Sequence, residues 1–141
     1  MAQESKSKPL LAALLCLMIT KGNCVCLRCM NDYVDVGQQL VEDDHSKVVV
    51  AGVHTVYTFR VTVTNRCCCE VSNVVVAARG FRSAIPVDPK LFRRIPGEEE
   101  KNYLVGDGKT ILNNGSGLTF FYAWSTVFRM DVISMTVSKC W

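Results

Sequence analysis

The sequence predicts an all-β protein: a single antiparallel β-sandwich of about seven to eight strands, stabilised by disulfides and preceded by a signal peptide. Three observations lead to this prediction: period-two alternation of apolar residues, turn residues at regular spacing, and many cysteines behind an apolar N-terminal run. One domain fits the 141 residues, because single domains commonly contain about 100–150 residues. A hydrophobic content of 49% is enough for one core.

The N-terminus has the layout of a secretory signal peptide. Lys6 and Lys8 precede the apolar run Leu10–Thr20, and small or polar residues follow it. The run is too short for a membrane span, which needs about 20 apolar residues, so we expect no span. We predict that residues 1–22 are the signal peptide, with cleavage at 22/23 or alternatively at 24/25, and that residues 23–141 form the sandwich domain. The other interpretation, an N-terminal core helix, lacks a cap where the run stops.

The clearest strand runs from Val53 to Thr64. Its apolar and aromatic side chains fall on one face and mostly polar ones on the other, which is typical of a half-buried strand. Glycine-rich turns at Gly106–Gly108 and Asn113–Gly117 separate the later strands. The remaining predicted strands are Tyr33–Leu40, Val71–Ala78, Tyr103–Val105, Lys109–Leu112, Leu118–Trp124 and Val127–Val137.

The last predicted strand changes its apolar phase. Apolar residues occupy even positions from Phe128 to Val132 and odd positions from Ile133 to Val137. Because side chains alternate between the two faces of a strand, one extra residue must interrupt the pairing there. The sequence therefore predicts a β-bulge in this strand.

Secretion would change the meaning of the eight cysteines. Disulfides persist in oxidising compartments and are rare in the cytosol, so bridges are the default for a secreted chain. Cleavage at 22/23 leaves seven cysteines, and an odd count leaves one thiol for an intermolecular bond or a free state. Cleavage at 24/25 leaves six instead. The seven are Cys24, Cys26, Cys29, Cys67, Cys68, Cys69 and Cys140.

The same cysteines could supply soft ligands for zinc or copper(I). Structural zinc sites, however, favour two separated C-x2–4-C knuckles, and the contiguous run Cys67–Cys69 is not one. On a strand, Cys67 and Cys69 point to one face and Cys68 to the other. We therefore expect no metal and no cofactor, and an extracellular metal-binding protein is only a third interpretation.

Other classes of function find little support. A net charge of +3 and a pI near 8.4 are too mildly basic for nucleic-acid binding, which usually needs a pI above about 9. His45 lies in a polar loop and His54 on the polar face of a strand, while acidic runs such as Glu98–Glu100 fall in expected loops. The sequence contains no nucleophile elbow, zinc-protease motif or phosphate-binding loop. We expect that the protein is not an enzyme.

Several segments carry a resemblance to a known family. The most specific is Phe81–Ile95, with the sequence FRSAIPVDPKLFRRI, and Asn65–Cys67 and Phe121–Ala123 add to it. With these segments in order between Cys29 and Cys140, the chain resembles the Tapetum Determinant 1 family of small secreted cysteine-rich plant proteins. The best-known member is a protein ligand for a leucine-rich-repeat receptor kinase that fixes cell fate in the anther. The resemblance implies a signalling role of that class in the apoplast, and leaves the receptor, the tissue and the oligomeric state open.

The resemblance also assigns roles to individual cysteines. Relatives carry two further cysteines where this chain has Ala78 and Tyr103, which implies that one bridge is absent here as a unit. Cys68 matches no family cysteine and is the expected odd thiol, unless it pairs with Cys24 or Cys26. The framework cysteines that remain can pair in three ways, and the sequence does not choose among them. They are Cys29, Cys67, Cys69 and Cys140.

A basic segment from Arg79 to Arg94 is the candidate receptor-binding surface. It holds five of the sixteen basic residues, and arginine suits bidentate pairing with the carboxylates of a partner. A solvated basic loop is the plainer interpretation, and the Arg93–Arg94 pair could also be a processing site. Asn114 begins an N-glycosylation sequon in an expected exposed turn. The five basic residues are Arg79, Arg82, Lys90, Arg93 and Arg94.

A second function, from a different class, is that of a secreted carbohydrate- or cell-wall-binding sandwich. It would need an exposed platform of aromatic rings, and Tyr122 and Trp124 share one face of their strand. Exposed rings would favour carbohydrate binding, whereas buried rings would favour the signalling ligand. The rings concerned are Tyr103, Tyr122, Trp124 and Trp141.

Overall fold

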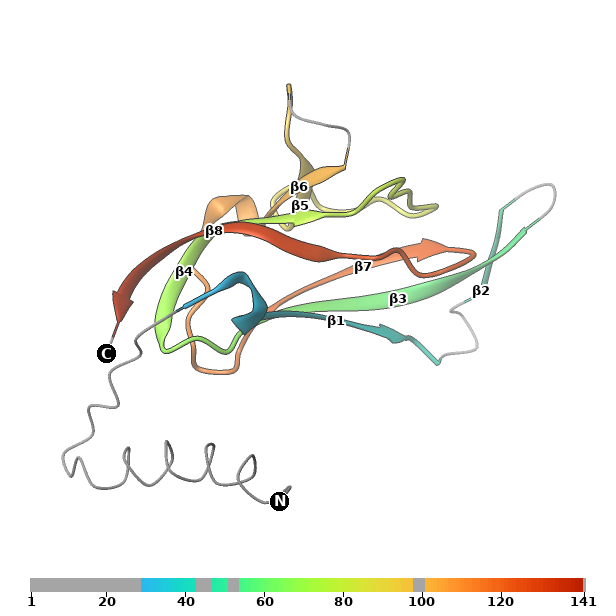
Figure 1. The fold of residues 1–141 in the computed structure, drawn as a ribbon. Coiled ribbons are helices and arrows are strands. Elements are labelled where there is room, and N and C mark those ends of the chain that lie inside the picture. The colour runs from blue at the N-terminus through green and yellow to red at the C-terminus, as the bar shows by residue number, and fades with distance from the viewer. Residues whose placement is uncertain (1–28, 43–46, 51–53, 98–100, 141) are drawn as a thin grey trace, which may run out of the picture.

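The computed structural model describes residues 29–42, 47–50, 54–97 and 101–140. These residues form eight strands and two short 3-10 helices, and the strands make two antiparallel sheets (Figure 1). The prediction of an all-β sandwich with disulfides is confirmed. Within these ranges, no helix has the length and apolar character needed to cross a membrane. The predicted signal peptide and its cleavage site lie outside the described residues.

The first sheet is built around the long strand β3 (His54–Asn65). Its partners, all antiparallel to it, are β1 (Val34–Leu40), β2 (Lys47–Val50) and β7 (Leu118–Trp124). Tyr57 pairs with both β2 and β7, and Val61 pairs with both β1 and β7. Strands β1 and β2 therefore share the edge of β3 that lies opposite β7.

The second sheet has the strand order β5-β6-β4-β8. Its strands are β4 (Cys69–Ala77), β5 (Phe92–Arg94), β6 (Asn102–Val105) and β8 (Asp131–Cys140), and every neighbouring pair is antiparallel. Strand β4 follows β3 directly along the chain, so the turn between them joins the two sheets.

The hydrophobic core lies between the two sheets. Strand β3 contributes Phe59, Val61 and Val63, whose exposed fractions are 7%, 0% and 0%. These residues belong to the face that the alternation predicts to be apolar, and Phe120 and Tyr122 of β7 lie opposite them in register. Burying a side chain of this size stabilises the fold by about 1.5–3 kcal/mol. The other core residues are Val34, Val71, Val74, Val76, Ala78, Phe92, Val105, Ile111 and Met130.

The predicted strand Lys109–Leu112 is wrong. A 3-10 helix, η3 (Gly106–Gly108), precedes this segment, and Ile111 makes only a single bridge to Val71 of β4. Strands β2 and β5 were missed by the sequence analysis. With four and three residues they are too short to display an alternating pattern.

The last strand begins at Asp131 rather than at Val127. Phe128 has the apolar side chain that alternation requires, but its backbone bonds to side chains instead of to a neighbouring strand. Its N–H donates to the hydroxyl of Tyr122 at 3.3 Å, and its carbonyl accepts from Nε2 of Gln38 at 2.7 Å. The side chains of this segment therefore alternate as they would in a strand, although its backbone is not paired with a neighbouring strand.

The predicted β-bulge is confirmed. Between the pairs Val76–Val132 and Val75–Ser134, strand β8 gains one residue, Ile133. Two further irregularities occur in the same β4–β8 ladder. Because bulges bend a strand and increase its twist, they account for the strong curvature of both strands in Figure 1.

Candidate functional site

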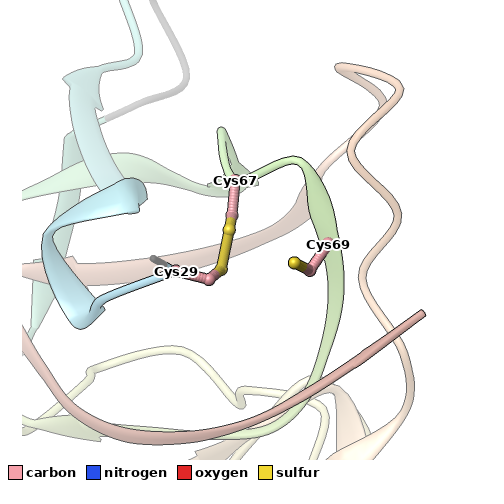
Figure 2. A group of neighbouring side chains, drawn as sticks. All are labelled: Cys29, Cys67 and Cys69. Atoms are coloured by element: carbon pink, nitrogen blue, oxygen red, sulfur yellow. A yellow bond between two sulfur atoms is a disulfide. The ribbon is translucent and has the colours of Figure 1, made fainter. Parts of the chain in front are cut away.

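Three consecutive cysteines connect the two sheets at the turn from β3 to β4. Cys67 is bonded to Cys29, which lies just before the 3-10 helix η2 (Asn31–Tyr33). Cys69 opens β4 and is bonded to its strand partner Cys140 at the end of β8. Figure 2 shows the Cys29–Cys67 bridge with the sulfur of Cys69 facing it. The two bridges therefore tie the N-terminal segment and the last strand to one turn.

Cys68 is also disulfide-bonded. The other cysteines of the described ranges pair with one another. Of the two possibilities left open for Cys68, an odd thiol or a bridge to Cys24 or Cys26, the bonded state rules out the odd thiol, and the identity of the partner stays a prediction. The alternation within the triplet is as predicted, because Cys67 and Cys69 are 2% and 1% exposed whereas Cys68 is half-buried.

Asn65, the last residue of β3, holds this turn together. Its side chain is buried, and its Nδ2 donates to the carbonyls of Cys69 at 2.8 Å and Ile111 at 2.9 Å. Its Oδ1 accepts from the N–H of Cys67 at 2.9 Å. One amide thus satisfies three backbone groups from three segments, which fixes where Cys67 and Cys69 lie.

The sulfurs of Cys29, Cys67 and Cys69 lie within 4.8 Å of one another. That spacing would suit a metal centre, but thiolates are the metal ligands among cysteine species. All three sulfurs are consumed in disulfides. The oxidised protein therefore offers no thiolate at this cluster.

The structure divides the five predicted basic residues. Arg79, Arg82 and Arg94 line one open hollow of about 530 Å³. Phe81 and Tyr103 provide its apolar lining, and Lys101 adds a fourth cation. We call this group the basic hollow. All three arginines are exposed.

Lys90 and Arg93 lie apart from the basic hollow. Arg93 and Arg94 are neighbours in β5, so their side chains point to opposite faces of the sheet. The Nε of Arg93 lies 3.2 Å from Oδ1 of Asp107. Lys90 lines a different hollow, which also contains Ile111 and Leu118.

Lys101 is the residue of the basic hollow that the sequence analysis missed. It lies 22 positions after Arg79 in the chain, but its carbonyl accepts a 2.7 Å hydrogen bond from the N–H of Ala78. Pairing of β4 with the segment that leads into β6 therefore brings Lys101 beside Arg79. Only the order of the strands in the second sheet shows that Lys101 and Arg79 are neighbours.

A second hollow of about 830 Å³ adjoins the first, because Arg79 and Lys101 line both. Its far end contains Arg129, Asp131 and the apolar Ile133. Arg129 and Asp131 form an ion pair of 2.6 Å on the surface. The two hollows together extend the basic surface from β5 across the sheet to β8.

Tyr122 lies at the centre of an internal polar network. It is 0% exposed, and its hydroxyl donates to Oε1 of Gln38 at 2.7 Å while accepting from Phe128. Burial raises the pKa of the Tyr122 phenol, and the hydrogen bond from Phe128 opposes this shift only in part. Tyr122 is thus a structural residue that closes the first sheet against the segment before β8.

The aromatic platform required for carbohydrate binding is not formed by the rings in the described ranges. Tyr122 is fully buried, and Trp124 is half-buried with its ring 6.3 Å from that of Phe128. Tyr103 stacks on Phe92 with ring centroids 4.6 Å apart. By the criterion set above, these rings belong to the core and favour the signalling ligand. Trp141 lies outside the described residues.

Asn114 lies in an exposed turn between η3 and β7. Its Oδ1 accepts hydrogen bonds from the N–H of Ser116 at 3.0 Å and from the hydroxyl of Ser116 at 2.5 Å. The position is accessible, and glycosylation of Asn114 stays a prediction.

Comparison with known proteins identifies the family. Residues 38–139 match the family model described as "Tapetum determinant 1, C-terminal". Neither the search of curated proteins nor the search of solved structures finds a match. The matched range contains the turn from β3 to β4 with Cys67, Cys68 and Cys69, which we call the cysteine turn, and it contains the basic hollow. The chain therefore belongs to the Tapetum determinant 1 family of plant signalling proteins, which act in anther development.

Proposed function

We propose that this protein is a secreted ligand for the ectodomain of a leucine-rich-repeat receptor kinase, acting in cell-fate specification during anther development. Membership of the Tapetum determinant 1 family supports the signalling role. The disulfides at the cysteine turn support secretion, because such bridges persist in oxidising compartments. The apolar run Leu10–Thr20 supports the same conclusion, since it has the character of a signal peptide.

The choice of binding surface rests on the basic hollow. It combines three exposed arginines with an apolar lining from Phe81 and Tyr103. Arginine is enriched at interfaces and forms bidentate hydrogen bonds with carboxylates. An apolar patch beside these donors allows a partner side chain to be desolvated, which strengthens the charged contacts. The corresponding receptor surface should be acidic.

The test is a titration of the purified protein against the receptor ectodomain with two triple charge-reversal variants. The test variant is Arg79→Glu, Arg82→Glu and Arg94→Glu. The control variant is Arg60→Glu, Lys90→Glu and Lys109→Glu, which are also exposed but do not line the basic hollow. Both variants change the net charge equally, so a difference between them reports location and not total charge.

We expect the test variant to weaken binding at least about tenfold, or about 1.4 kcal/mol, relative to the control variant. The wild-type affinity should also fall as salt concentration rises, because exposed charge pairs are screened. Equal affinities of the two variants would remove the basic hollow from the receptor interface. Absence of binding by the wild-type protein to any leucine-rich-repeat ectodomain tested would contradict the proposed class of partner.

A further inference from the structure

The sulfur cluster at the cysteine turn contains chemistry that receptor binding does not use. Two disulfides lie next to each other there, and they differ in exposure. We propose that Cys140 is a thiol-exchange site: a small external thiol opens the Cys69–Cys140 bridge, and the released Cys69 thiolate then exchanges with the Cys29–Cys67 bridge. This inference is independent of the proposed receptor.

The difference in exposure decides where an external thiol attacks. Cys140 is exposed at the end of β8, whereas Cys69 is 1% exposed at the start of β4. Exchange proceeds by attack of a thiolate on one sulfur of the bridge, and access determines which sulfur is attacked. The incoming thiolate therefore reaches the sulfur of Cys140.

The first step is balanced without an oxidant. The external thiolate forms a new sulfur–sulfur bond to Cys140, and the Cys69–Cys140 bond breaks. The electron pair of the broken bond stays on Cys69, which leaves as a thiolate. The product is a mixed disulfide on Cys140 and one buried thiolate on Cys69.

The second step follows from the position of Cys69. Its sulfur lies within 4.8 Å of the sulfurs of both Cys29 and Cys67 (Figure 2). The Cys69 thiolate attacks Cys29, a Cys29–Cys69 bond forms, and Cys67 leaves as the thiolate. Attack on Cys67 is disfavoured because only one residue separates the two cysteines, which restricts the geometry of a bridge between them.

The hydrogen bonds of Asn65 keep these sulfurs together after the first bridge opens. They fix the N–H of Cys67 and the carbonyl of Cys69, and neither bond involves Cys140. The consequence is a selective release. The end of β8 loses its covalent link to β4, while the N-terminal segment stays bonded to the cysteine turn through Cys29.

Two serine variants test the exchange step. Cys140→Ser leaves the Cys69 thiol beside the Cys29–Cys67 bridge, whereas Cys69→Ser leaves the Cys140 thiol at the exposed end of β8. Both variants lose the same bridge, so both lose the same covalent constraint. Each oxidised variant is incubated at pH 8 and in parallel at pH 5, and is then alkylated. The alkylated cysteine is located by fragmentation mass spectrometry, because the cysteines at 67 to 69 share one peptide.

We expect the alkyl label of Cys140→Ser to shift from Cys69 to Cys67 at pH 8. The shift should be slower at pH 5, because the thiolate is the nucleophile and a free cysteine has a pKa of about 8.5. The label of Cys69→Ser should stay on Cys140. In the wild-type protein, brief treatment with glutathione should give an adduct on Cys140 before Cys29, Cys67 or Cys69. Label that stays on Cys69, or that moves to Cys29 or Cys68 instead of Cys67, overturns the proposal. An adduct that forms on Cys29, Cys67 or Cys69 before Cys140 also overturns it.

Discussion

The cysteine turn and the basic hollow are maintained in opposite ways. At the turn, a 2%-exposed asparagine satisfies three backbone groups, and two disulfides tie the N-terminal segment and the last strand to it. At the basic hollow, exposed arginines are presented from a loop and from the three-residue strand β5. The difference shows how this small sandwich separates its tasks. Buried, satisfied groups hold the sheets together at one place, and exposed charges at another form the surface that we propose for receptor recognition.

The contrast between the cysteine turn and the basic hollow predicts that the largest loss of stability follows from Asn65→Ala. The substitution leaves the buried carbonyls of Cys69 and Ile111 and the N–H of Cys67 without their side-chain partner. The carbonyl of Ile111 keeps the hydrogen bond from the N–H of Val71, so two groups lose their partner. Each unsatisfied buried group costs about 1–3 kcal/mol, so the free energy of unfolding should fall by about 2 kcal/mol or more. Urea denaturation of the oxidised protein measures this loss. Asn113→Ala, at an exposed loop position, is the matched control and should change it by less than about 0.5 kcal/mol.

A smaller loss is expected from Tyr122→Phe, which keeps the ring and removes the hydroxyl. Oε1 of Gln38 and the N–H of Phe128 lose their partner, so the free energy of unfolding at neutral pH should fall by about 1–2 kcal/mol. Tyr33→Phe removes an exposed hydroxyl and should have almost no effect. A similar loss in both variants would show that the Tyr122 network contributes nothing specific.

The same pair of variants has a pH signature. Burial raises the pKa of Tyr122 in the folded protein above its ordinary value of 10.0. The neutral phenol is therefore favoured by folding, and this contribution is fully present below pH 10 and is lost as the pH rises through the folded pKa. The stability difference between wild type and Tyr122→Phe should shrink over that alkaline range. A difference that stays constant up to the folded pKa would contradict the assignment.

The smallest effect on stability should come from the triple variant of the basic hollow. Substitutions at exposed positions usually change stability by no more than about 0.5 kcal/mol each, and surface ion pairs contribute about 0–1 kcal/mol. Urea midpoints of the Arg79, Arg82 and Arg94 charge-reversal variant should therefore lie close to that of the wild type, although receptor affinity falls. A strongly destabilised triple variant would erase the contrast between the two regions.

Local patterns predicted much of the sandwich. Alternation along β3 identified which of its residues face the core, and the phase change after Val132 located the bulge at Ile133. Composition identified the basic segment, but it did not predict which of its residues share one surface. Arg93 and Arg94 are adjacent in sequence, yet a strand sends them to opposite faces. Lys101 joins the basic hollow only through the pairing of its segment with the end of β4.

The sequence by itself determined the fold class, the apolar faces of the long strands and the family. These follow from residue spacing and from motifs that are read within a short stretch of chain. Tertiary structure alone decided which cysteines pair, that Cys68 is bonded, and that Tyr122 is buried with its hydroxyl satisfied. The physical reason is distance along the chain. Cys69 and Cys140 are 71 residues apart, and only the order of strands in the second sheet makes them neighbours.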